Sequence, residues 1–414
     1  MRMERVILHS DLNNFYASVE CLYNPGLKDK PVAVCGSQST RHGIVLAKNY
    51  LAKKYGVKTA ETVREALDKC PGLVIVKPNY SLYLKFSAMA RRIYERYTDM
   101  VEGFGIDESW LDVTESARLF GNGDKIAEEI RGRVKSELGI TVSVGVSYNK
   151  MFSKMASDMK KPDAVTMITR ENYREKLWGL PVKELLYVGA STRKKLNNAA
   201  IFTIGDLAAA SPDFLTRLLG VWGRTLWLFA NGHDETPVMR TDQESVIKGI
   251  GNSITTPRDM VSDGDIRTLS YVLAESVAER LRRNSFKGRT VQIWVRDCKL
   301  DSMTRQAKLP RHTDVTAEIA EKAHEIFLKS WDWKNPVRAY GIRVTDLVAA
   351  DGYIQMSMLT DDRHAKRELL DRSIDRIRAR FGHYSVQRAL LLKDRKLNAN
   401  PIEENAIHPV PYFR

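Results

Sequence analysis

The chain places two carboxylates side by side, Asp107 and Glu108, inside the otherwise apolar and aromatic segment GFGIDESWLDV at residues 103–113. In a regular strand neighbouring side chains point to opposite faces, so adjacent carboxylates can serve one site only where the chain turns or bulges. The segment therefore predicts two strands, over 100–106 and 109–113, that meet at an acidic turn. An ordinary solvated hairpin turn is the simplest interpretation of such a pair.

A third carboxylate, Asp11, stands at the end of a second short apolar run, RVILHSD at residues 5–11. This run predicts a buried strand, and the helical spacing of Phe15, Val19 and Leu22 predicts a helix directly after it. Asp11 is therefore expected at the end of a strand, which makes a shared site with the acidic turn more plausible than the turn alone would.

Further strands and helices follow in an order typical of an α/β sheet covered by helices. We expect a strand over 73–77, an alternating strand over 140–147, and helices over 81–97 and 124–138. Leu84, Ala88 and Ile93 should face inward from the first helix. The second helix should start at an Asp124 cap and end at Gly139. A sheet of this kind can hold the three carboxylates on neighbouring strands.

A small insertion at residues 38–72 is expected to contain two short helices, the second opened by the capping-box pattern of Thr62 and Glu65. Past Pro162 the pattern changes to short helices punctuated by glycines. From about residue 243 a second α/β unit is predicted, and one further helix should follow in a polar tail. The helices of this second unit are expected over 265–284 and 315–330, and the helix of the tail over 365–381.

The net charge of +14, from 65 Lys and Arg against 51 Asp and Glu, favours a polyanionic partner. Nucleic acid is preferred over a membrane surface, because no basic amphipathic helix stands beside a hydrophobic anchor. Residues 280–311 contain ten basic and two acidic groups.

A reducing cytoplasm is the expected location. The four cysteines show no C-x-x-C spacing, so neither a zinc site nor a disulfide framework is indicated. No apolar run approaches the roughly 18 residues that span a bilayer. The N-terminal apolar run is too short for the core of a signal peptide.

Three carboxylates near one another require positive charge between them. Oxygen ligands without nearby His or Cys favour magnesium or manganese over zinc. Two such ions about 4 Å apart serve in-line phosphoryl transfer.

Five segments resemble the Y-family translesion DNA polymerases, most closely the bacterial DNA polymerase IV type. They are SDLNNFYASVE (10–20), AKNYLAKKYGV (47–57), GIDESWLDVT (105–114), SVGVSYNKMFSKMASDMKKP (143–162) and GIGNSITTPRD (249–259). The similarity runs in order from residue 5 to about residue 345. It implies an α/β, or α+β, multidomain fold shaped like a right hand. The domains would be a ferredoxin-like palm (1–37 and 73–174), small fingers (38–72), a helical thumb (175–242), an α/β little finger that binds DNA (243–347) and a C-terminal tail (348–414).

The resemblance also implies the metal ligands. Asp11, Asp107 and Glu108 match the family's metal-binding carboxylates, with the main-chain carbonyl of Leu12 as a further ligand. Asp107 and Glu108 would be the catalytic carboxylates. The implied cofactor is a pair of Mg²⁺ ions, for which Mn²⁺ can substitute.

The nucleotide pocket is implied in the same way. Tyr16 matches the aromatic residue under the sugar of the incoming nucleotide, and Phe15 is its neighbour; for both, packing in a helix core is the alternative. Tyr50, Lys53 and Lys161 match the triphosphate-binding positions, although either lysine can also be a solvated surface group. Lys53 stands where the family usually has arginine, so the bidentate contact that a guanidinium makes with a phosphate is lost at this position.

Two residues depart from the family pattern at positions that would cover the nascent base pair. Ile44 and Leu46 occupy positions that are often smaller in the family. The tolerance of bulky lesions is therefore an open question.

Contacts to DNA are expected in two places. Gly189, in the segment YVGAS, matches the thumb's helix-hairpin-helix, whose backbone amides hold a phosphate. The usual Pro-Gly-x-Gly reads VGAS here, so a plain helix-turn-helix is the alternative. In the basic window Arg289, Arg296 and Lys308 alternate with strand residues, which fits a phosphate backbone or an ordinary solvated face.

A pentapeptide in the tail resembles the motif by which bacterial polymerases bind the sliding clamp, usually Gln-Leu-Ser-Leu-Phe. A polar anchor followed by apolar side chains suits a hydrophobic groove. Its residues are Gln355, Met356, Ser357, Met358 and Leu359.

These features together indicate a monomeric, template-directed DNA polymerase of the translesion kind, without proofreading. It would add deoxynucleoside triphosphates to the primer of a primer-template DNA. One alternative is another phosphotransferase on a palm-like sheet, such as a nucleotide cyclase, for which the 47–57 and 143–162 segments would have no purpose. The other is a non-catalytic DNA-binding or clamp-tethered accessory protein, which would be free to lose the carboxylates.

Overall fold

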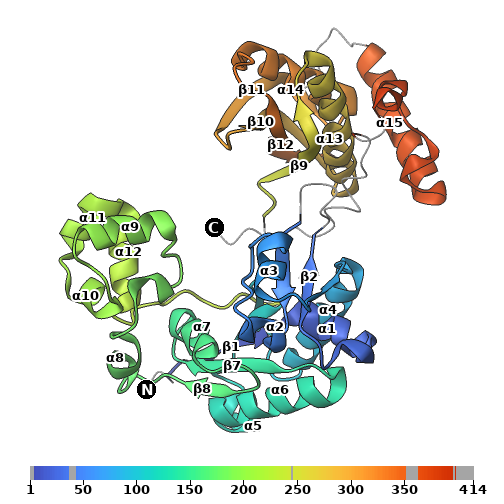
Figure 1. The fold of residues 1–414 in the computed structure, drawn as a ribbon. Coiled ribbons are helices and arrows are strands. Elements are labelled where there is room, and N and C mark those ends of the chain that lie inside the picture. The colour runs from blue at the N-terminus through green and yellow to red at the C-terminus, as the bar shows by residue number, and fades with distance from the viewer. Residues whose placement is uncertain (1–3, 37–42, 244–245, 351–361, 395–396, 398–414) are drawn as a thin grey trace. The chain divides into compact units, whose positions relative to one another are not determined.

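The computed structural model describes residues 4–36, 43–243, 246–350, 362–394 and 397. These residues divide into two compact units, one ending at residue 243 and the other beginning at residue 246 (Figure 1). Within the described part of the chain, none of the helices combines the length and the apolar character needed to cross a lipid bilayer.

The first unit is built on a five-stranded sheet with the strand order β5-β6-β1-β7-β8. Its strands are β1 (Ile7–Leu12), β5 (Val101–Gly103), β6 (Glu108–Asp112), β7 (Val142–Ser147) and β8 (Val165–Met167). β1 lies in the middle and runs antiparallel to both β6 and β7. This arrangement confirms that the segment ending at Asp11 and the segment after the acidic turn are neighbouring strands.

Helices cover both faces of this sheet. α4 (Tyr80–Tyr94) and α6 (Gly123–Leu138) share a hydrophobic core with Leu8 and Leu12 of β1. α7 (Lys150–Met159) packs on the other face, so closely that a Cβ on Gly145 would lie 2.0 Å from the carbonyl oxygen of Ser153. Every residue of β7 is therefore buried, and the alternation expected over 140–147 is wrong.

The inward face of α4 differs from the expected one. Leu84 and Ala88 are exposed, whereas Ile93 is buried as expected. The buried stripe also contains larger aromatic residues that lie one position before Leu84 and two positions after it, Tyr83 and Phe86. The helix is thus rotated relative to the prediction because the aromatic side chains fill more of the core.

The start of α6 also differs from the prediction. Asn122 caps the helix by accepting a hydrogen bond from the backbone N–H of Lys125, whereas Asp124 lies in the first turn. A carboxylate in the first turn is still favourable because it faces the positive end of the helix dipole. Gly139 ends the helix with φ 70°, as expected.

A separate three-stranded sheet, ordered β3-β2-β4, accompanies the insertion. Its strands are β2 (Val32–Cys35), β3 (Val45–Lys48) and β4 (Val74–Val76). The strand expected over 73–77 is therefore present, but it belongs to this sheet rather than to the sheet of β1. The two short helices α2 (Tyr50–Lys54) and α3 (Val63–Lys69) are confirmed, and Thr62 and Glu65 form the expected capping box.

The remaining helices of the first unit are short. Those that form the glycine-punctuated region are α8 (Tyr173–Leu177), α9 (Ala190–Asn198), α10 (Ile204–Ala209), α11 (Pro212–Leu219) and α12 (Val221–Ala230). Two further helices are α1 (Phe15–Tyr23) and α5 (Ala117–Phe120). A Cβ on Gly223 would lie 2.0 Å from the carbonyl oxygen of Leu215, so the close approach of α11 and α12 requires glycine there.

The second unit contains a four-stranded antiparallel sheet with the order β11-β10-β12-β9. Its strands are β9 (Gly249–Met260), β10 (Phe286–Asp297), β11 (Ser302–Thr313) and β12 (Val337–Ala349). α13 (Asp263–Arg283) and α14 (Thr316–Ser330) bury their apolar faces in the core that the sheet provides. The predicted second α/β unit is therefore confirmed.

The expected C-terminal helix is α15 (Asp362–Phe381), and it is joined to α13 by buried ion pairs. Glu275 of α13 accepts hydrogen bonds from Arg378 at 2.9 Å and Arg388 at 3.0 Å. Arg282 bonds Asp375 and Asp371, and Arg388 also bonds Asp371. We call these six residues the arginine cluster. The segment after residue 361 thus contributes to the interior of the second unit.

Candidate active site

Strand pairing brings the predicted carboxylates together. Asp11 of β1 lies directly opposite Glu108 of β6, and the backbone N–H of Leu12 donates to the carbonyl of Asp107 at 3.0 Å. Asp11 is only 6% exposed. The acidic turn is therefore not an ordinary solvated hairpin, because it faces a third, nearly buried carboxylate across the sheet.

Two lysines from α7 and the segment after it lie among these carboxylates. Lys154 Nζ is 3.0 Å from Glu108, 3.5 Å from Asp11 and 3.0 Å from Asp158. Lys161 Nζ is 2.6 Å from Asp11 and 2.9 Å from Asp158. We call the set of Asp11, Asp107, Glu108, Asp158, Lys154 and Lys161 the acidic cluster.

The sequence prediction included Lys161 but missed Lys154 and Asp158. Both missed residues stand inside the quoted segment 143–162, four positions apart, so that one turn of α7 brings their charges together. A lysine within a mainly apolar helical segment, here MFSKMA at 151–156, is the signal that could have identified Lys154.

Negative charge exceeds positive charge in the acidic cluster, and the pKa values reflect this. Burial, followed by the charges of Glu108 and Asp11, raises the pKa of Asp107 to about 7. Burial and Glu108 also raise the pKa of Asp11, against the opposing effect of Lys154 and Lys161. Burial disfavours the ammonium of Lys154, but Glu108, Asp11 and Asp158 together raise its pKa above the ordinary value.

His9 lies beneath the cluster on the same face of β1. Its side chain is fully buried, its Nδ1 is 2.9 Å from the hydroxyl of Ser157, and its ring packs edge-on against Trp110. Burial, with a further contribution from Lys154, holds its pKa well below the usual value. A neutral His9 adds no positive charge that would offset the carboxylates.

The donor set fits a hard divalent cation, although it is not arranged as a closed metal site. The described residues include no group of three or more His, Cys, Asp or Glu side chains placed to hold one ion. The donors are carboxylate oxygens, and the pKa of Asp107 is raised first by burial and then by the charges of Glu108 and Asp11.

Tyr16 lies on the first turn of α1 and is held by other aromatic rings. Its ring stacks on Tyr83 with centroids 4.3 Å apart and an angle of 9°, and meets Tyr80 edge-on. The hydroxyl of Tyr83 donates to the buried carboxylate of Glu20 at 2.6 Å, which fixes the supporting ring. Phe15 is 3% exposed and packs in the core, in agreement with the structural alternative considered for it.

The helix α2 presents the other predicted triphosphate residues. Asn49 caps α2, so that Tyr50 is its first residue and Lys53 lies one turn later, 5.7 Å from the ring of Tyr50. Burial raises the pKa of Tyr50, and the charges that act on it most are Lys161 and Asp11. Tyr50 is therefore within electrostatic reach of the acidic cluster. Ile44 is 39% exposed, and Leu46 is half-buried in β3.

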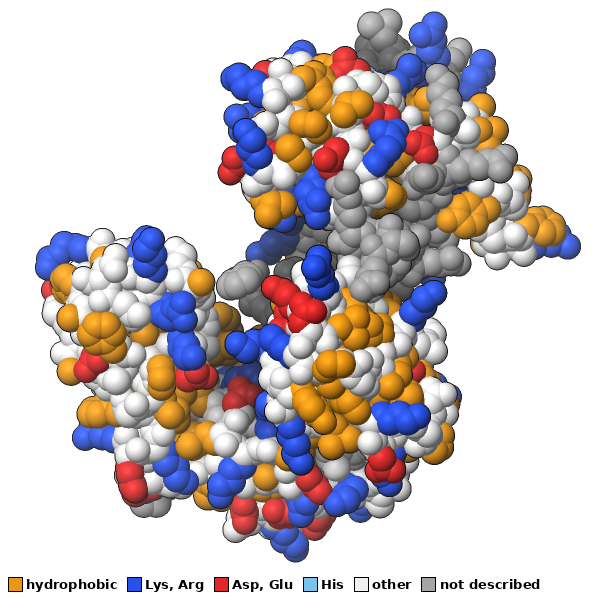
Figure 2. All heavy atoms as spheres, in the orientation of Figure 1, with side chains coloured by type: hydrophobic (Ala, Val, Ile, Leu, Met, Phe, Trp, Pro, Cys, Tyr) orange, Lys and Arg blue, Asp and Glu red, His pale blue; other side chains and the backbone are white. Residues whose placement is uncertain are grey.

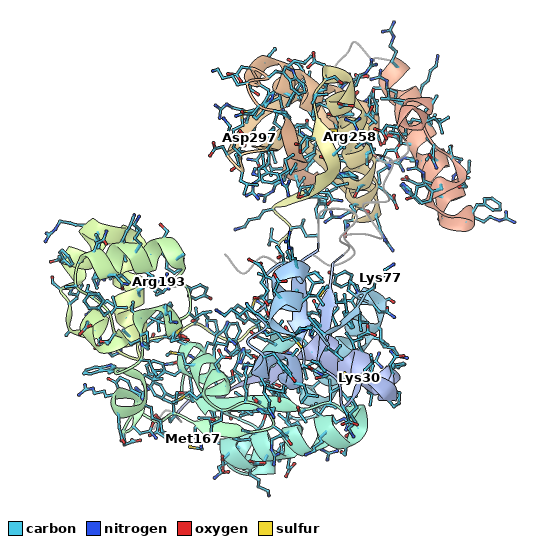
Figure 3. The ribbon with its side chains drawn as sticks, viewed as in Figure 1. Lys30, Lys77, Met167, Arg193, Arg258 and Asp297 are labelled. Atoms are coloured by element: carbon cyan, nitrogen blue, oxygen red, sulfur yellow. The ribbon has the colours of Figure 1, made fainter. Side chains whose placement is uncertain are left out.

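The predicted DNA contacts lie on separate elements. Gly189 is the N-cap of α9, without a side-chain cap, and Arg193 of the same helix is labelled in Figure 3. In the second unit Arg289 donates to the carbonyl of Leu309, Arg296 lies over the ring of Trp294, and Lys308 is exposed on β11. Figure 2 shows Lys and Arg side chains along the side of this unit where Figure 1 places β11. The pentapeptide at 355–359 lies outside the described residues.

Comparison with known proteins identifies the family. The model of the impB/mucB/samB family matches residues 10–158, and the model of its C-terminal domain matches residues 247–358. A protein of Acetivibrio thermocellus named DNA polymerase IV is 65% identical over 397 residues, which covers 96% of this chain and 100% of the relative. A DNA polymerase IV of Moorella thermoacetica is 39% identical over 93% of this chain and 96% of its own length.

A solved structure supports the fold. A Y-family DNA polymerase chimera superimposes with a TM-score of 0.73 at 24% identity, covering 83% of this chain and 99% of the chimera. The described part of the chain therefore has the mixed α/β, multidomain fold of a Y-family polymerase. The chain belongs to the impB/mucB/samB family, the Y-family of DNA polymerases.

Proposed function

We propose that this chain is a template-directed DNA polymerase of the translesion kind, which adds deoxynucleotides to a primer 3′-hydroxyl and has no proofreading activity. The observation that carries the proposal is the placement of Asp11 opposite Glu108, beside Asp107, with an excess of negative charge. Relatives named DNA polymerase IV that match almost the whole chain support the same activity.

The described elements suit the domains expected from the sequence. The sheet of β1 would be the palm, the insertion with α2 and α3 the fingers, the helices α8 to α12 the thumb, and the second unit the little finger. We propose the boundaries expected above, although α8 begins two residues before the thumb range and β12 ends two residues after the little-finger range. The segment from 348 to 414 would follow the little finger.

Two Mg²⁺ ions, or Mn²⁺ in their place, would be held by Asp11, Asp107, Glu108 and the main-chain carbonyl of Leu12. When bound, such ions lower the pKa of an attacking hydroxyl and neutralise a leaving pyrophosphate. The carboxylates of this chain supply the negative charge that attracts the ions and fix their place at the ends of β1 and β6.

The surrounding side chains would bind and orient the nucleotide. Tyr50, Lys53 and Lys161 offer a hydroxyl and two ammonium groups to the triphosphate, while Tyr16 presents a rigid ring to the sugar. Phe15 supports the pocket from within the core. Ring packing selects a sugar by shape, because an added hydroxyl would have to enter filled space.

DNA would be held by the backbone amides at Gly189 and by the basic surface that includes Arg289, Arg296 and Lys308. We propose the cytoplasm as the location and a monomer as the active form. The pentapeptide at 355–359 would bind a sliding clamp. Deleting it should leave extension by the isolated enzyme unchanged and remove stimulation by a loaded clamp; stimulation that survives the deletion would contradict this role.

The test of the proposed function is extension of a labelled primer on a template of defined sequence by the purified chain. We expect addition of nucleotides complementary to the template, dependence on Mg²⁺, and no removal of a mismatched primer end. Conversion of nucleotides without a primer would favour a nucleotide cyclase instead. DNA binding without synthesis would favour an accessory protein.

A further inference from the structure

Lys161 makes two ion pairs, one with a carboxylate that would also bind a metal ion and one with a carboxylate that would not. Its ammonium is 2.6 Å from Asp11, which would be a metal ligand, and 2.9 Å from Asp158, which would not. The side chain is 25% exposed, so solvent and a ligand can reach it. Lys161 therefore contacts the carboxylates while part of its side chain remains open to solvent.

Lys154 differs from Lys161 in its surroundings. It contacts Glu108, Asp11 and Asp158, and its side chain is only 11% exposed. Three carboxylate partners and burial hold its ammonium in place, because moving it would leave Glu108 without its lysine counterion, whereas Asp11 and Asp158 would keep Lys161. Of the two lysines, Lys161 is the one that can exchange its partner.

The same carboxylate of Asp11 cannot accept the Lys161 ammonium at 2.6 Å and at the same time bind a metal ion without mutual repulsion of the two cations. A triphosphate carries several negative charges and is a stronger partner for an ammonium than one carboxylate. Asp158 retains Lys161 on the other side, so the lysine can turn toward a nucleotide without leaving the site.

We propose that Lys161 is an exchangeable counterion that occupies Asp11 in the enzyme without nucleotide and is transferred to the triphosphate when a nucleotide binds, which frees Asp11 for a divalent cation. This inference rests on the proposed function. It couples metal binding and nucleotide binding through one side chain, and the coupling acts equally in both directions. Asp158 is the positioning residue that keeps Lys161 near the site in both states.

The proposal predicts that one substitution has two opposite effects. Lys161→Met should raise the affinity of the full chain for Mn²⁺ in the absence of nucleotide and DNA, by at least about fivefold, which is the lower end of usual coupling between sites. The binding of Mn²⁺ is measured from the loss of its free-ion signal in electron paramagnetic resonance. The same variant should lower the affinity for a complementary deoxynucleotide on a primer-template whose primer ends in a dideoxynucleotide.

Two variants serve as controls, and a third replaces the test variant if that variant does not fold. Lys160→Met removes the neighbouring lysine, for which neither Asp11 nor Asp158 is a recorded partner, and should change Mn²⁺ affinity less than about twofold, the effect of a more distant charge. Lys161→Arg keeps the charge and should bind Mn²⁺ as the wild type does. If Lys161→Met does not fold, as judged by circular dichroism, Lys161→Gln takes its place.

Tighter Mn²⁺ binding by Lys161→Met than by Lys160→Met, together with weaker nucleotide binding, supports the exchange. Equal Mn²⁺ affinity for Lys161→Met, Lys160→Met and the wild type overturns it. The Mn²⁺ titration involves no synthesis, so its result is independent of the proposed function, which fails separately if the wild type does not extend a primer.

Discussion

Two clusters of charged side chains among the residues that the structure describes, each with buried members, are built differently. The acidic cluster contains four carboxylates, Asp11, Asp107, Glu108 and Asp158, against two ammonium groups. The arginine cluster contains three carboxylates, Glu275, Asp371 and Asp375, against three guanidinium groups. One cluster has two more negative than positive charges, while the other is balanced.

The kind of cation differs as well. In the arginine cluster Arg282 bonds both carboxylate oxygens of Asp375, at 2.6 and 2.9 Å, so a planar fork matches a planar carboxylate. In the acidic cluster the cations are lysines, which act as point charges on flexible stems and change partners more readily. The balanced guanidinium–carboxylate pairs hold α13 and the segment after residue 361 together. The acidic cluster, with lysines and an excess of carboxylates, can accept a further cation.

The largest effect should come from removing a carboxylate of the acidic cluster. Glu108→Gln should reduce primer extension by at least about a hundredfold, because electrostatic stabilisation at a reacting centre is usually worth that much. DNA affinity should remain largely intact, since the basic surfaces hold the DNA. Single-turnover extension and DNA binding are measured on the same variant; substantial residual synthesis would contradict the assignment of Glu108.

The arginine cluster should affect stability instead of synthesis. Glu275→Gln leaves Arg378 and Arg388 without their buried partner, and breaking such a pair costs roughly 3–5 kcal/mol of the free energy of unfolding. The measurement is denaturant unfolding of the full chain.

Glu325 provides a matched control in the same unit. It also pairs with two cations, Lys322 and Lys329, but its side chain is 44% exposed. Glu325→Gln should cost about 1 kcal/mol or less, because exposed pairs are screened by water. Equal costs for Glu275→Gln and Glu325→Gln would remove the basis for treating the arginine cluster as a structural feature.

A smaller effect is expected from the aromatic pocket near the acidic cluster. Tyr16→Ala should raise the incorporation of ribonucleotides relative to deoxyribonucleotides by at least about tenfold, because overpacking strain of roughly 1–3 kcal/mol is lost. Tyr16→Phe keeps the ring that stacks on Tyr83 and should retain the selectivity. The two incorporation efficiencies are measured on one primer-template. A ratio unchanged in Tyr16→Ala would mean that Tyr16 serves only in packing.

The smallest effect is expected at the exposed basic strand β11. Lys308→Ala should weaken DNA binding and lower the slope of log affinity against log salt by about 0.9, the value for one lost phosphate contact. Lys329→Ala on α14 removes an exposed lysine outside this strand and should leave the slope unchanged. A slope that does not change in Lys308→Ala would place the DNA elsewhere.

Local patterns predicted much of the fold and the central part of the candidate site. The strand ending at Asp11 and the turn at Asp107 could be predicted because short apolar runs with polar ends have few other solutions. The capping box of Thr62 and Glu65 and the stop at Gly139 are local signals of the same kind. The exposure of Leu84 was not predictable in this way, because the rotation of α4 depends on which side chains fill the core.

Features that depend on distant partners were missed. Lys154 stands 46 positions from Glu108 and 143 from Asp11, so only the packing of α7 on the sheet brings them together. The partners in the arginine cluster are similarly remote, with Arg388 113 positions from Glu275. Ion pairs of this kind leave no periodic pattern in the sequence. The sequence therefore predicted a helix in a polar tail, but not the packing of that segment against α13.

We expect that the excess of negative charge in the acidic cluster favours cation binding and lowers the stability of the fold. Asp107→Asn is the sharpest test above pH 7, where the carboxyl of Asp107 is ionised, because the substitution then removes one charge and changes the size of the side chain little. Thermal unfolding is measured in the presence of a chelator for the wild type and Asp107→Asn. Above pH 7 we expect a higher Tm for Asp107→Asn, since the carboxyl whose pKa burial and its neighbours raise to about 7 no longer repels Asp11 and Glu108. A lower Tm for Asp107→Asn would contradict it.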